Sequence, residues 1–122
     1  MLLVEDNPVN KKLATLMLTK GGYLVEIADN GREAVEKFTN SPDDFDLILM
    51  DIQMPEMDGM TATQAIRSKG FDTIPIIAMT AHAMKGDREK CIEAGMDDYV
   101  TKPIRRETVF QMIEKWIFSR EI

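Results

Sequence analysis

The feature that most constrains the fold of this chain is an alternation of short apolar runs with helical patterns, repeated five times along the sequence. Three of the apolar runs contain no polar residue, which is typical of strands buried on both faces of a parallel sheet. Helices between such strands cover both faces, and right-handed connections then give a doubly wound α/β sandwich. The runs expected to form strands are residues 2–4, 24–28 (at a sheet edge), 47–50, 76–79 and 99–100.

The helices expected between these strands have recognisable ends. Asn7 is a good N-cap and Pro8 a good first residue for the first helix, and Gly21 is a good stop. Four apolar residues recur at helical spacing on one face of this helix: Val9, Leu13, Leu16 and Met17. Further helices are expected to open at residue 30, to run from about 59 to 68 and from about 84 to 94, and to carry an apolar stripe over 109–117.

Length and composition exclude several classes of protein. The chain has 122 residues and is 44% hydrophobic, which suits one domain over residues 1–122 and is too apolar for a disordered chain. No uncharged run approaches the ~18 residues of a membrane span. The single cysteine, Cys91, excludes a disulfide framework and a cysteine-based zinc site, and favours a cytoplasmic location. The net charge of -6 argues against direct binding to nucleic acid.

Polar residues follow four of the expected strands, each at the point where the strand ends. Glu5 and Asp6 follow the first strand, Asp51 the third, Thr80 the fourth and Lys102 the fifth. Doubly wound sheets bind ligands at the carboxyl ends of their strands, near the point where the strand order reverses. We therefore expect three carboxylates, a hydroxyl and an ammonium group to meet at one edge of the sheet.

This set of side chains predicts a particular chemistry. Neighbouring carboxylates repel one another unless a cation compensates their charge. Oxygen ligands without His or Cys indicate a hard ion such as Mg²⁺, which keeps waters and shares its remaining positions with a phosphate. That leaves room for a phosphoryl group between the metal, Thr80 and Lys102, and an aspartate can itself be the nucleophile in phosphoryl transfer.

The motifs that carry these residues are LLVEDN, ILMDIQMPEMDG, IIAMTAHAM and GMDDYVTKPI, in this order. With them, essentially the whole chain resembles the receiver domain of two-component response regulators. The resemblance implies a flavodoxin-like (βα)5 fold with the strand order 2-1-3-4-5. The segments AMTAHAM and DDYVTKPI are most similar to receivers fused to hybrid sensor histidine kinases.

The resemblance implies a role for each carboxylate. Asp51 would be the phosphoacceptor, attacking a phosphohistidine on a partner protein. Asp6 and Asp51 would ligate Mg²⁺ directly, and Glu5 would act through a bound water. The backbone carbonyl of Gln53 would complete the protein ligands, and Mn²⁺ is a candidate substitute for Mg²⁺.

The resemblance also implies how the phosphoryl group is held and sensed. Thr80, the backbone amide of Ala81 and Lys102 would bind its oxygens, and a cis peptide before Pro103 would aim the lysine. Phosphorylation would draw Thr80 inward and Tyr99 would follow, changing the face built from the fourth helix, fifth strand and fifth helix. The alternative for Tyr99 is a half-buried strand aromatic without a switch role.

Two further side chains are candidates for tuning the lifetime of the phosphoryl group. Gln53 lies two residues after Asp51, and His82 lies two residues after Thr80. Both would flank the route of the attacking water. For His82, a partly exposed loop histidine is the alternative interpretation.

The partners implied are a histidine kinase or a histidine phosphotransfer domain, docking at the exposed part of the first helix around Asn10, Lys11 and Ala14. An output partner or a dimer mate would bind the face of the fourth helix, fifth strand and fifth helix. No enzymatic turnover is implied beyond Mg-dependent self-phosphorylation and autodephosphorylation. A hybrid sensor that contained this chain would itself be a histidine kinase.

Three other functions stand as alternatives. A phosphatase of the haloacid dehalogenase type also uses an Asp nucleophile, but it needs a second carboxylate where this chain has Gln53. A flavin-binding module needs a Ser/Thr/Gly-rich phosphate loop where this chain has Glu5 and Asp6. A degenerate receiver used only for docking is expected to lack site residues, whereas none is missing here.

Overall fold

A computed structural model of the chain describes residues 1–52, 59–80, 85–102 and 104–118. Its parallel five-stranded sheet has the order β2-β1-β3-β4-β5, which confirms the predicted doubly wound architecture and strand order. Along the chain the elements are β1 (Leu2–Val4), α1 (Pro8–Lys20), β2 (Glu26–Ala28), α2 (Gly31–Asn40), the 3-10 turn η1 (Pro42–Asp44), β3 (Ile48–Asp51), α3 (Gly59–Ser68), β4 (Ile76–Thr80), α4 (Lys85–Glu93), β5 (Asp98–Thr101) and α5 (Arg106–Phe118).

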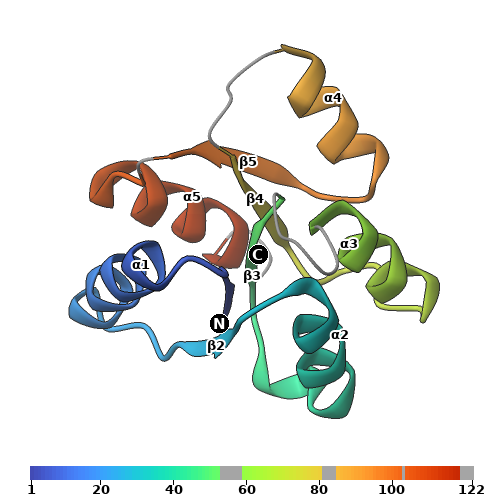
Figure 1. Cartoon of the computed structure of the whole chain (residues 1–122), viewed down its shortest axis with the longest axis horizontal. Coiled ribbons are helices and arrows are strands. Elements are labelled where there is room, and N and C mark those ends of the chain that lie inside the picture. Colours follow the sequence, from blue (N-terminus) through green and yellow to red (C-terminus); the bar gives the residue numbers. More distant parts are fainter. Residues whose placement is uncertain (53–58, 81–84, 103, 119–122) are drawn as a thin grey trace.

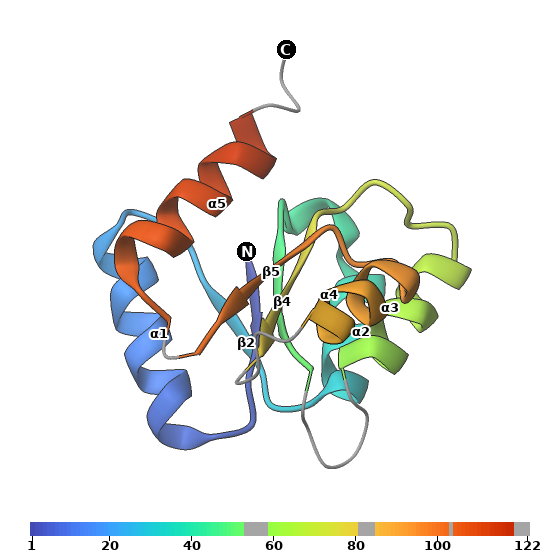
Figure 2. The same ribbon diagram turned by 90° about the horizontal axis from the view of Figure 1, so that it is seen from above.

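The sheet is the middle layer of three. Helices α1 and α5 cover one face, and α2, α3 and α4 cover the other (Figure 1), as the view in Figure 2 also shows. Leu2 and Val4 of β1 pack in the cluster that contains α2 and α3, whereas Leu3 packs with α1 and α5. β1 is thus buried on both faces, as its lack of polar residues predicts.

Hydrogen bonds account for the helix ends that the sequence predicts. The side chain of Asn7 accepts from the backbone N–H groups of Val9 and Asn10 at the start of α1. Asn30 caps α2 in the same way, because its side chain accepts from the N–H of Glu33 at 2.8 Å. The bounds of α3 are those predicted, and α4 lies within the predicted range 84–94.

The apolar face of α1 differs from a simple core-facing stripe. Val9, Leu13 and Leu16 are 66%, 59% and 50% exposed, while the residues of α1 that are buried are Ala14 and Leu18. The expectation that Ala14 belongs to the exposed part of this helix is therefore wrong. The helix is apolar on more than one side, and the side with Ala14 and Leu18 packs against the sheet, so Val9, Leu13 and Leu16 face outward.

The edge strand β2 is shorter than predicted. The expected strand 24–28 is confirmed only over Glu26–Ala28, and Leu24 is 89% exposed. The register pairs Glu26 with Leu2, the first residue of β1, so Leu24 lies beyond the paired part of the ladder. Its position at the edge of the sheet is as predicted.

Candidate functional site at the carboxyl edge of the sheet

The register of the sheet brings the predicted site residues to one edge. β1 and β3 are neighbours with Val4 opposite Met50, so Glu5 and Asp51 follow side by side. On the other side of β3, the backbone N–H of Lys102 donates to the carbonyl of Thr80 at 2.7 Å and continues the pairing of β4 with β5. Each functional side chain is thus positioned by the end of a buried strand.

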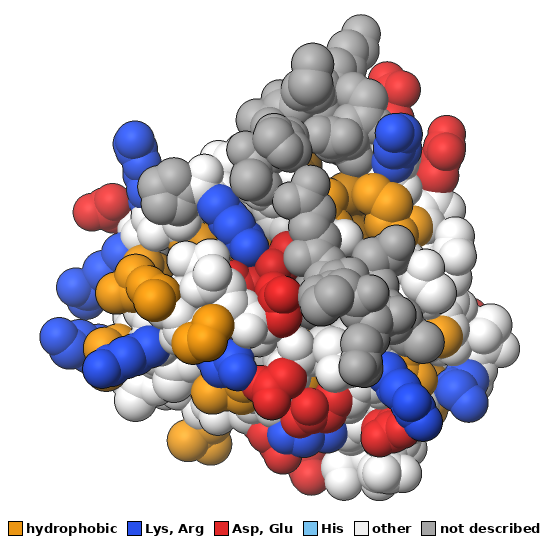
Figure 3. All heavy atoms as spheres, viewed as in Figure 1, with side chains coloured by type: hydrophobic (Ala, Val, Ile, Leu, Met, Phe, Trp, Pro, Cys, Tyr) orange, Lys and Arg blue, Asp and Glu red, His pale blue; other side chains and the backbone are white. Residues whose placement is uncertain are grey.

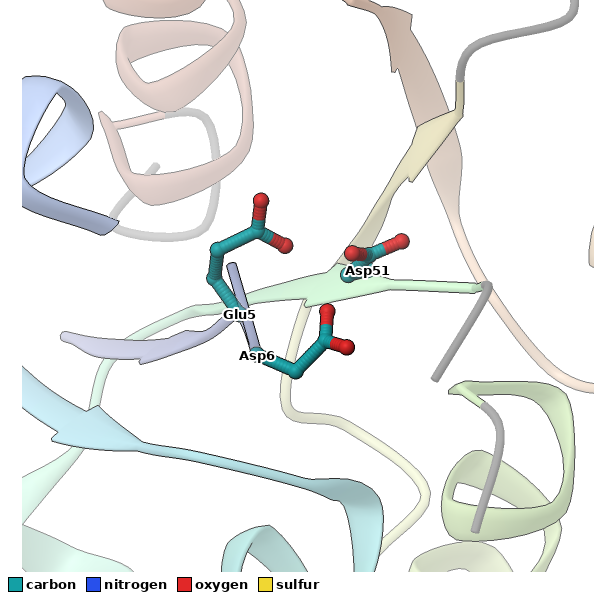
Figure 4. Close-up of side chains that lie close together, drawn as sticks. All are labelled: Glu5, Asp6 and Asp51. Atoms are coloured by element: carbon teal, nitrogen blue, oxygen red, sulfur yellow. The ribbon is translucent and has the colours of Figure 1, made fainter. Parts of the chain in front are cut away.

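Three carboxylates converge at this edge. One oxygen from each of Glu5, Asp6 and Asp51 lies within 4.8 Å of the others, and Figure 4 shows the three side chains directed into the same space. Glu5 and Asp51 are each only 2% exposed, and Asp6 is the most exposed of the three. Three oxygen donors around one point, two of them buried, fit a hard cation such as Mg²⁺.

Lys102 supplies a positive charge to this cluster from the end of β5. Its Nζ donates to Oδ2 of Asp51 at 2.8 Å and to Oε1 and Oε2 of Glu5 at 3.1 and 3.3 Å. The lysine side chain is largely buried. These charge-assisted contacts hold both buried carboxylates and leave Asp6 as the carboxylate nearest to solvent.

The crowding of charge shifts two pKa values. The pKa of Glu5 is raised to about 7, first by burial and then by the hydrogen bond and charge of Asp51, although the charge of Lys102 acts in the opposite direction. Burial alone would lower the pKa of Lys102, but hydrogen bonds and charge from Asp51 and Glu5 raise it overall. Glu5 therefore exchanges a proton near neutral pH, while Lys102 stays charged.

The remaining predicted residues are placed only in part. Thr80 is buried as the last residue of β4, and half-buried Tyr99 of β5 packs against the core cluster on the α2 and α3 side. The expectations for Gln53, Ala81, His82 and Pro103 lie outside the described residues. Cys91 is buried.

Gly59 has a positioning role that was not predicted from the sequence. A Cβ built on this first residue of α3 would lie 2.5 Å from the carbonyl oxygen of Asp51 and 2.9 Å from Cα of Ile52. Real side chains do not approach backbone this closely, so only glycine lets α3 begin against the end of β3. A glycine at the start of a helix, eight residues after the phosphoacceptor candidate, was the available signal.

A cavity beside the carboxylates was also not predictable. It has a volume of about 90 Å³ and extends from Glu5 and Lys102 to apolar side chains of α1. The lining residues from α1 include Leu13, Ala14 and Met17. The outward face of α1 therefore borders the site directly, and Figure 3 shows apolar side chains with lysines over this helix.

Comparisons with known proteins agree on one family. The family model described as "Response regulator receiver domain" matches residues 1–114. The chain is 47% identical over 123 residues to hybrid signal transduction histidine kinase I of Dictyostelium discoideum, covering 96% of this chain and 7% of that protein. It is 44% identical over 117 residues to the histidine-protein kinase BarA of Escherichia coli K12, covering 95% of this chain and 12% of that protein.

Solved structures give the same result. The receiver domain of a Pseudomonas aeruginosa sensor histidine kinase, with a magnesium ion coordinated in its active-site cleft, is 44% identical with a TM-score of 0.86, covering 95% and 94% of the two chains. A Saccharomyces cerevisiae receiver domain, co-crystallised with a histidine phosphotransfer protein, is 29% identical with a TM-score of 0.91, covering 99% and 90%. On the family match, the fold and these relatives, the chain belongs to the response regulator receiver domain family.

Proposed function

We propose that Asp51 accepts a phosphoryl group from a phosphohistidine of a histidine kinase or phosphotransfer protein, and that this Mg-dependent reaction makes the chain a switch in a phosphorelay. The observation that carries the proposal is the convergence of three carboxylates within 4.8 Å, with Lys102 Nζ 2.8 Å from Asp51. We further propose that residues 1–122 form a single receiver domain.

In this reaction a carboxylate oxygen of Asp51 attacks phosphorus, the P–N bond to the donor imidazole breaks, and an acyl phosphate forms. Lys102 then exchanges its contact with Asp51 for one with a phosphoryl oxygen, which keeps the added charge paired. We propose that Thr80 and the amide of Ala81 would hold other phosphoryl oxygens, and that a cis peptide before Pro103 would aim the lysine.

Asp6 and Asp51 would hold Mg²⁺ directly, Glu5 through water, and the backbone carbonyl of Gln53 would complete the set. Bound there, Mg²⁺ or its candidate substitute Mn²⁺ supplies positive charge against which the phosphoryl oxygens can approach the carboxylates. The related receiver structure with magnesium in its cleft supports this assignment.

The chain acts on its own side chain and is not a turnover enzyme in this proposal. Gln53 and His82 would set how fast water removes the phosphoryl group. The relatives at 41–47% identity include whole histidine kinases, of which this chain matches a small part. Kinase activity would belong to such a larger protein.

The switch would run through two neighbouring strands. Thr80 ends β4, and Tyr99 lies opposite Ala78 on β5. Movement of Thr80 toward phosphorylated Asp51 would make room for Tyr99, and the face of α4, β5 and α5 would change. The change occurs because the phosphoryl group binds one arrangement of this face more tightly than the other. An output partner or a dimer mate would bind the changed face.

The donor would dock on α1. Val9, Leu13 and Leu16 are exposed there, and Leu13 lines the cavity that reaches Lys102. Asn10 also lines the cavity, while Lys11 forms an ion pair with Asp29. None of the described helices is long and apolar enough to cross a membrane.

We propose a cytoplasmic location, because histidine donors of this kind transfer their phosphoryl group there.

The test is intact-mass spectrometry after incubation with Mg²⁺ and a small phosphodonor such as acetyl phosphate. The wild-type chain is expected to gain one phosphoryl group, and Asp51→Asn to gain none. Asp72→Asn, which changes an exposed acid in the α3–β4 loop, is the matched control and should be labelled normally. Undiminished labelling of Asp51→Asn would assign the phosphoacceptor to another residue.

A further inference from the structure

A second polar cluster lies at the opposite edge of the sheet from the carboxylates, and it is centred on Arg67 near the end of α3. The guanidinium donates through Nε to the carbonyl of Gly95 at 3.0 Å, through Nη1 to the carbonyl of Phe71 at 2.9 Å, and through Nη2 to Oδ2 of Asp97 at 3.0 Å. The arginine is mostly buried. One side chain thus ties α3 to the α3–β4 loop and to the turn between α4 and β5.

Asp97 carries this tie into the sheet. The same oxygen, Oδ2, also accepts from the backbone N–H of Ile76 at 2.9 Å, and the N–H of Asp97 donates to the carbonyl of Ile76 at 2.8 Å. Ile76 is the first residue of β4. The turn after α4 is therefore fixed to both the sheet and α3.

The turn itself is closely fitted around Arg67. Gly95 has φ +104°, and a Cβ there would lie 3.1 Å from Cγ of Arg67. The N–H of Gly95 donates to the carbonyl of Ile92, and that of Met96 donates to the carbonyl of Cys91. This pair of bonds is the Schellman motif, which closes the C-terminal end of a helix.

The contacts that the structure describes for α4 attach its C-terminal end. Its C-terminal end is closed by the Schellman motif, is bonded to Arg67, and buries Cys91 and Ala94. Its N-terminal end, Lys85, follows Thr80 by five residues and so lies toward the phosphoryl site. In the proposed switch, movement of Thr80 would act on α4 at the end far from the arginine.

We propose that the contacts of Arg67 with Gly95 and Asp97 form a fixed pivot, so that phosphorylation rotates α4 about its C-terminal end. The inference rests on the proposed function, in which phosphorylated Asp51 shifts the face that contains α4. The nine residues of α4 span about 14 Å, so a rotation of about 10° displaces the N-terminal end by about 2 Å and the pivot hardly at all. The pivot thereby converts a local pull at Thr80 into a directed change of one end of the helix.

The experiment measures two distances by electron paramagnetic resonance, with spin labels on the full chain. In a Cys91→Ala background, one label is attached to Lys20→Cys at the end of α1. The other is attached to either Lys85→Cys or Glu93→Cys, at the two ends of α4. Distances are recorded with Mg²⁺, before and after addition of beryllofluoride, a phosphoryl analogue. Mass spectrometry with acetyl phosphate establishes separately that each labelled protein still accepts a phosphoryl group.

The 20–85 distance is expected to change by up to about 2 Å and the 20–93 distance by less than about a third of that change, as for a rod turning at one end. With Arg67→Gln, both distances should change by similar amounts. Arg32→Gln, the same change at an exposed arginine of α2, should keep the wild-type pattern. Asp97→Asn, which keeps the shape of the side chain and removes its charge, provides a second variant if Arg67→Gln folds poorly.

Equal changes at both ends in the background protein would overturn the pivot, and so would an unaltered pattern in both Arg67→Gln and Asp97→Asn. Normal phosphorylation with no change in either distance would also overturn it while leaving the phosphoacceptor role intact. Loss of phosphorylation in the background protein, with Asp51 present, would instead remove the proposed function and the pivot with it.

Discussion

The ammonium group of Lys102 lies 2.8 Å from Oδ2 of Asp51, although 51 positions of sequence separate the two residues. The same ammonium group contacts both carboxylate oxygens of Glu5. This arrangement keeps two buried carboxylates tolerable side by side, because unpaired buried charges are costly. It also places the positive charge where an incoming phosphoryl group would arrive.

Removal of the Lys102 charge should destabilise the metal-free chain while Mg²⁺ binding is kept. Lys102→Ala is expected to bind Mg²⁺ still, because the three carboxylates remain, but to lose about 1–3 kcal/mol of unfolding free energy in metal-free buffer through the unpaired carboxylates. Mg²⁺ should restore more stability to the variant than to wild type. Urea unfolding with and without Mg²⁺ measures this, and Lys69→Ala, at an exposed lysine, is the control.

The switch itself has a separate test in the wild-type chain. Equal affinity for an output partner before and after phosphorylation would contradict it.

Mg²⁺ affinity should depend on pH through Glu5. The pKa of Glu5 is about 7 in the folded chain against an ordinary 4.5, so its protonated form contributes stability that is complete below about 4.5 and is lost as pH rises through about 7. Bound Mg²⁺ favours the ionised form, so apparent affinity should rise from about pH 6 to about pH 8 and then level off. Calorimetric titration measures this, and a Glu5→Gln variant with the same pH slope would refute the assignment.

Gly59→Ala should be destabilising, against the usual benefit of alanine in a helix. The added Cβ would lie 2.5 Å from the carbonyl oxygen of Asp51, so α3 or the end of β3 must move. We expect a loss of about 1–3 kcal/mol in unfolding free energy and slower phosphorylation of Asp51. Gln64→Ala, at an exposed position of the same helix, should be nearly neutral in the same denaturation assay.

Docking through α1 predicts a selective effect of a charge on its apolar face. Leu13→Glu should slow phosphoryl transfer from a histidine phosphotransfer protein at least about tenfold, because a carboxylate would face an apolar contact. Labelling by acetyl phosphate should be unchanged, since that donor needs no docking. Leu24→Glu, at a more exposed leucine outside this helix, between α1 and β2, is the control. Similar slowing by both substitutions would rule out docking at α1.

Features that depend on a few neighbouring residues could be predicted well. Asn7 and Asn30 cap helices through bonds to residues two or three positions away. The sites of β1, β3 and β4 follow from uninterrupted apolar runs. The edge at which polar residues would gather follows from the fact that parallel strands share a direction.

Other features depended on how the layers pack. No local pattern distinguishes the buried Ala14 side of α1 from the exposed Leu13 side, because both are apolar and the choice is made by fit against the sheet. The contact of Gly59 with β3 and the ties of Arg67 to Gly95 and Asp97 join residues far apart in the chain. Short-range patterns thus determined where the helices and strands lie and which groups share an edge, whereas distances, charge pairing and the outward face of α1 were settled by long-range packing, which no short stretch of residues encodes.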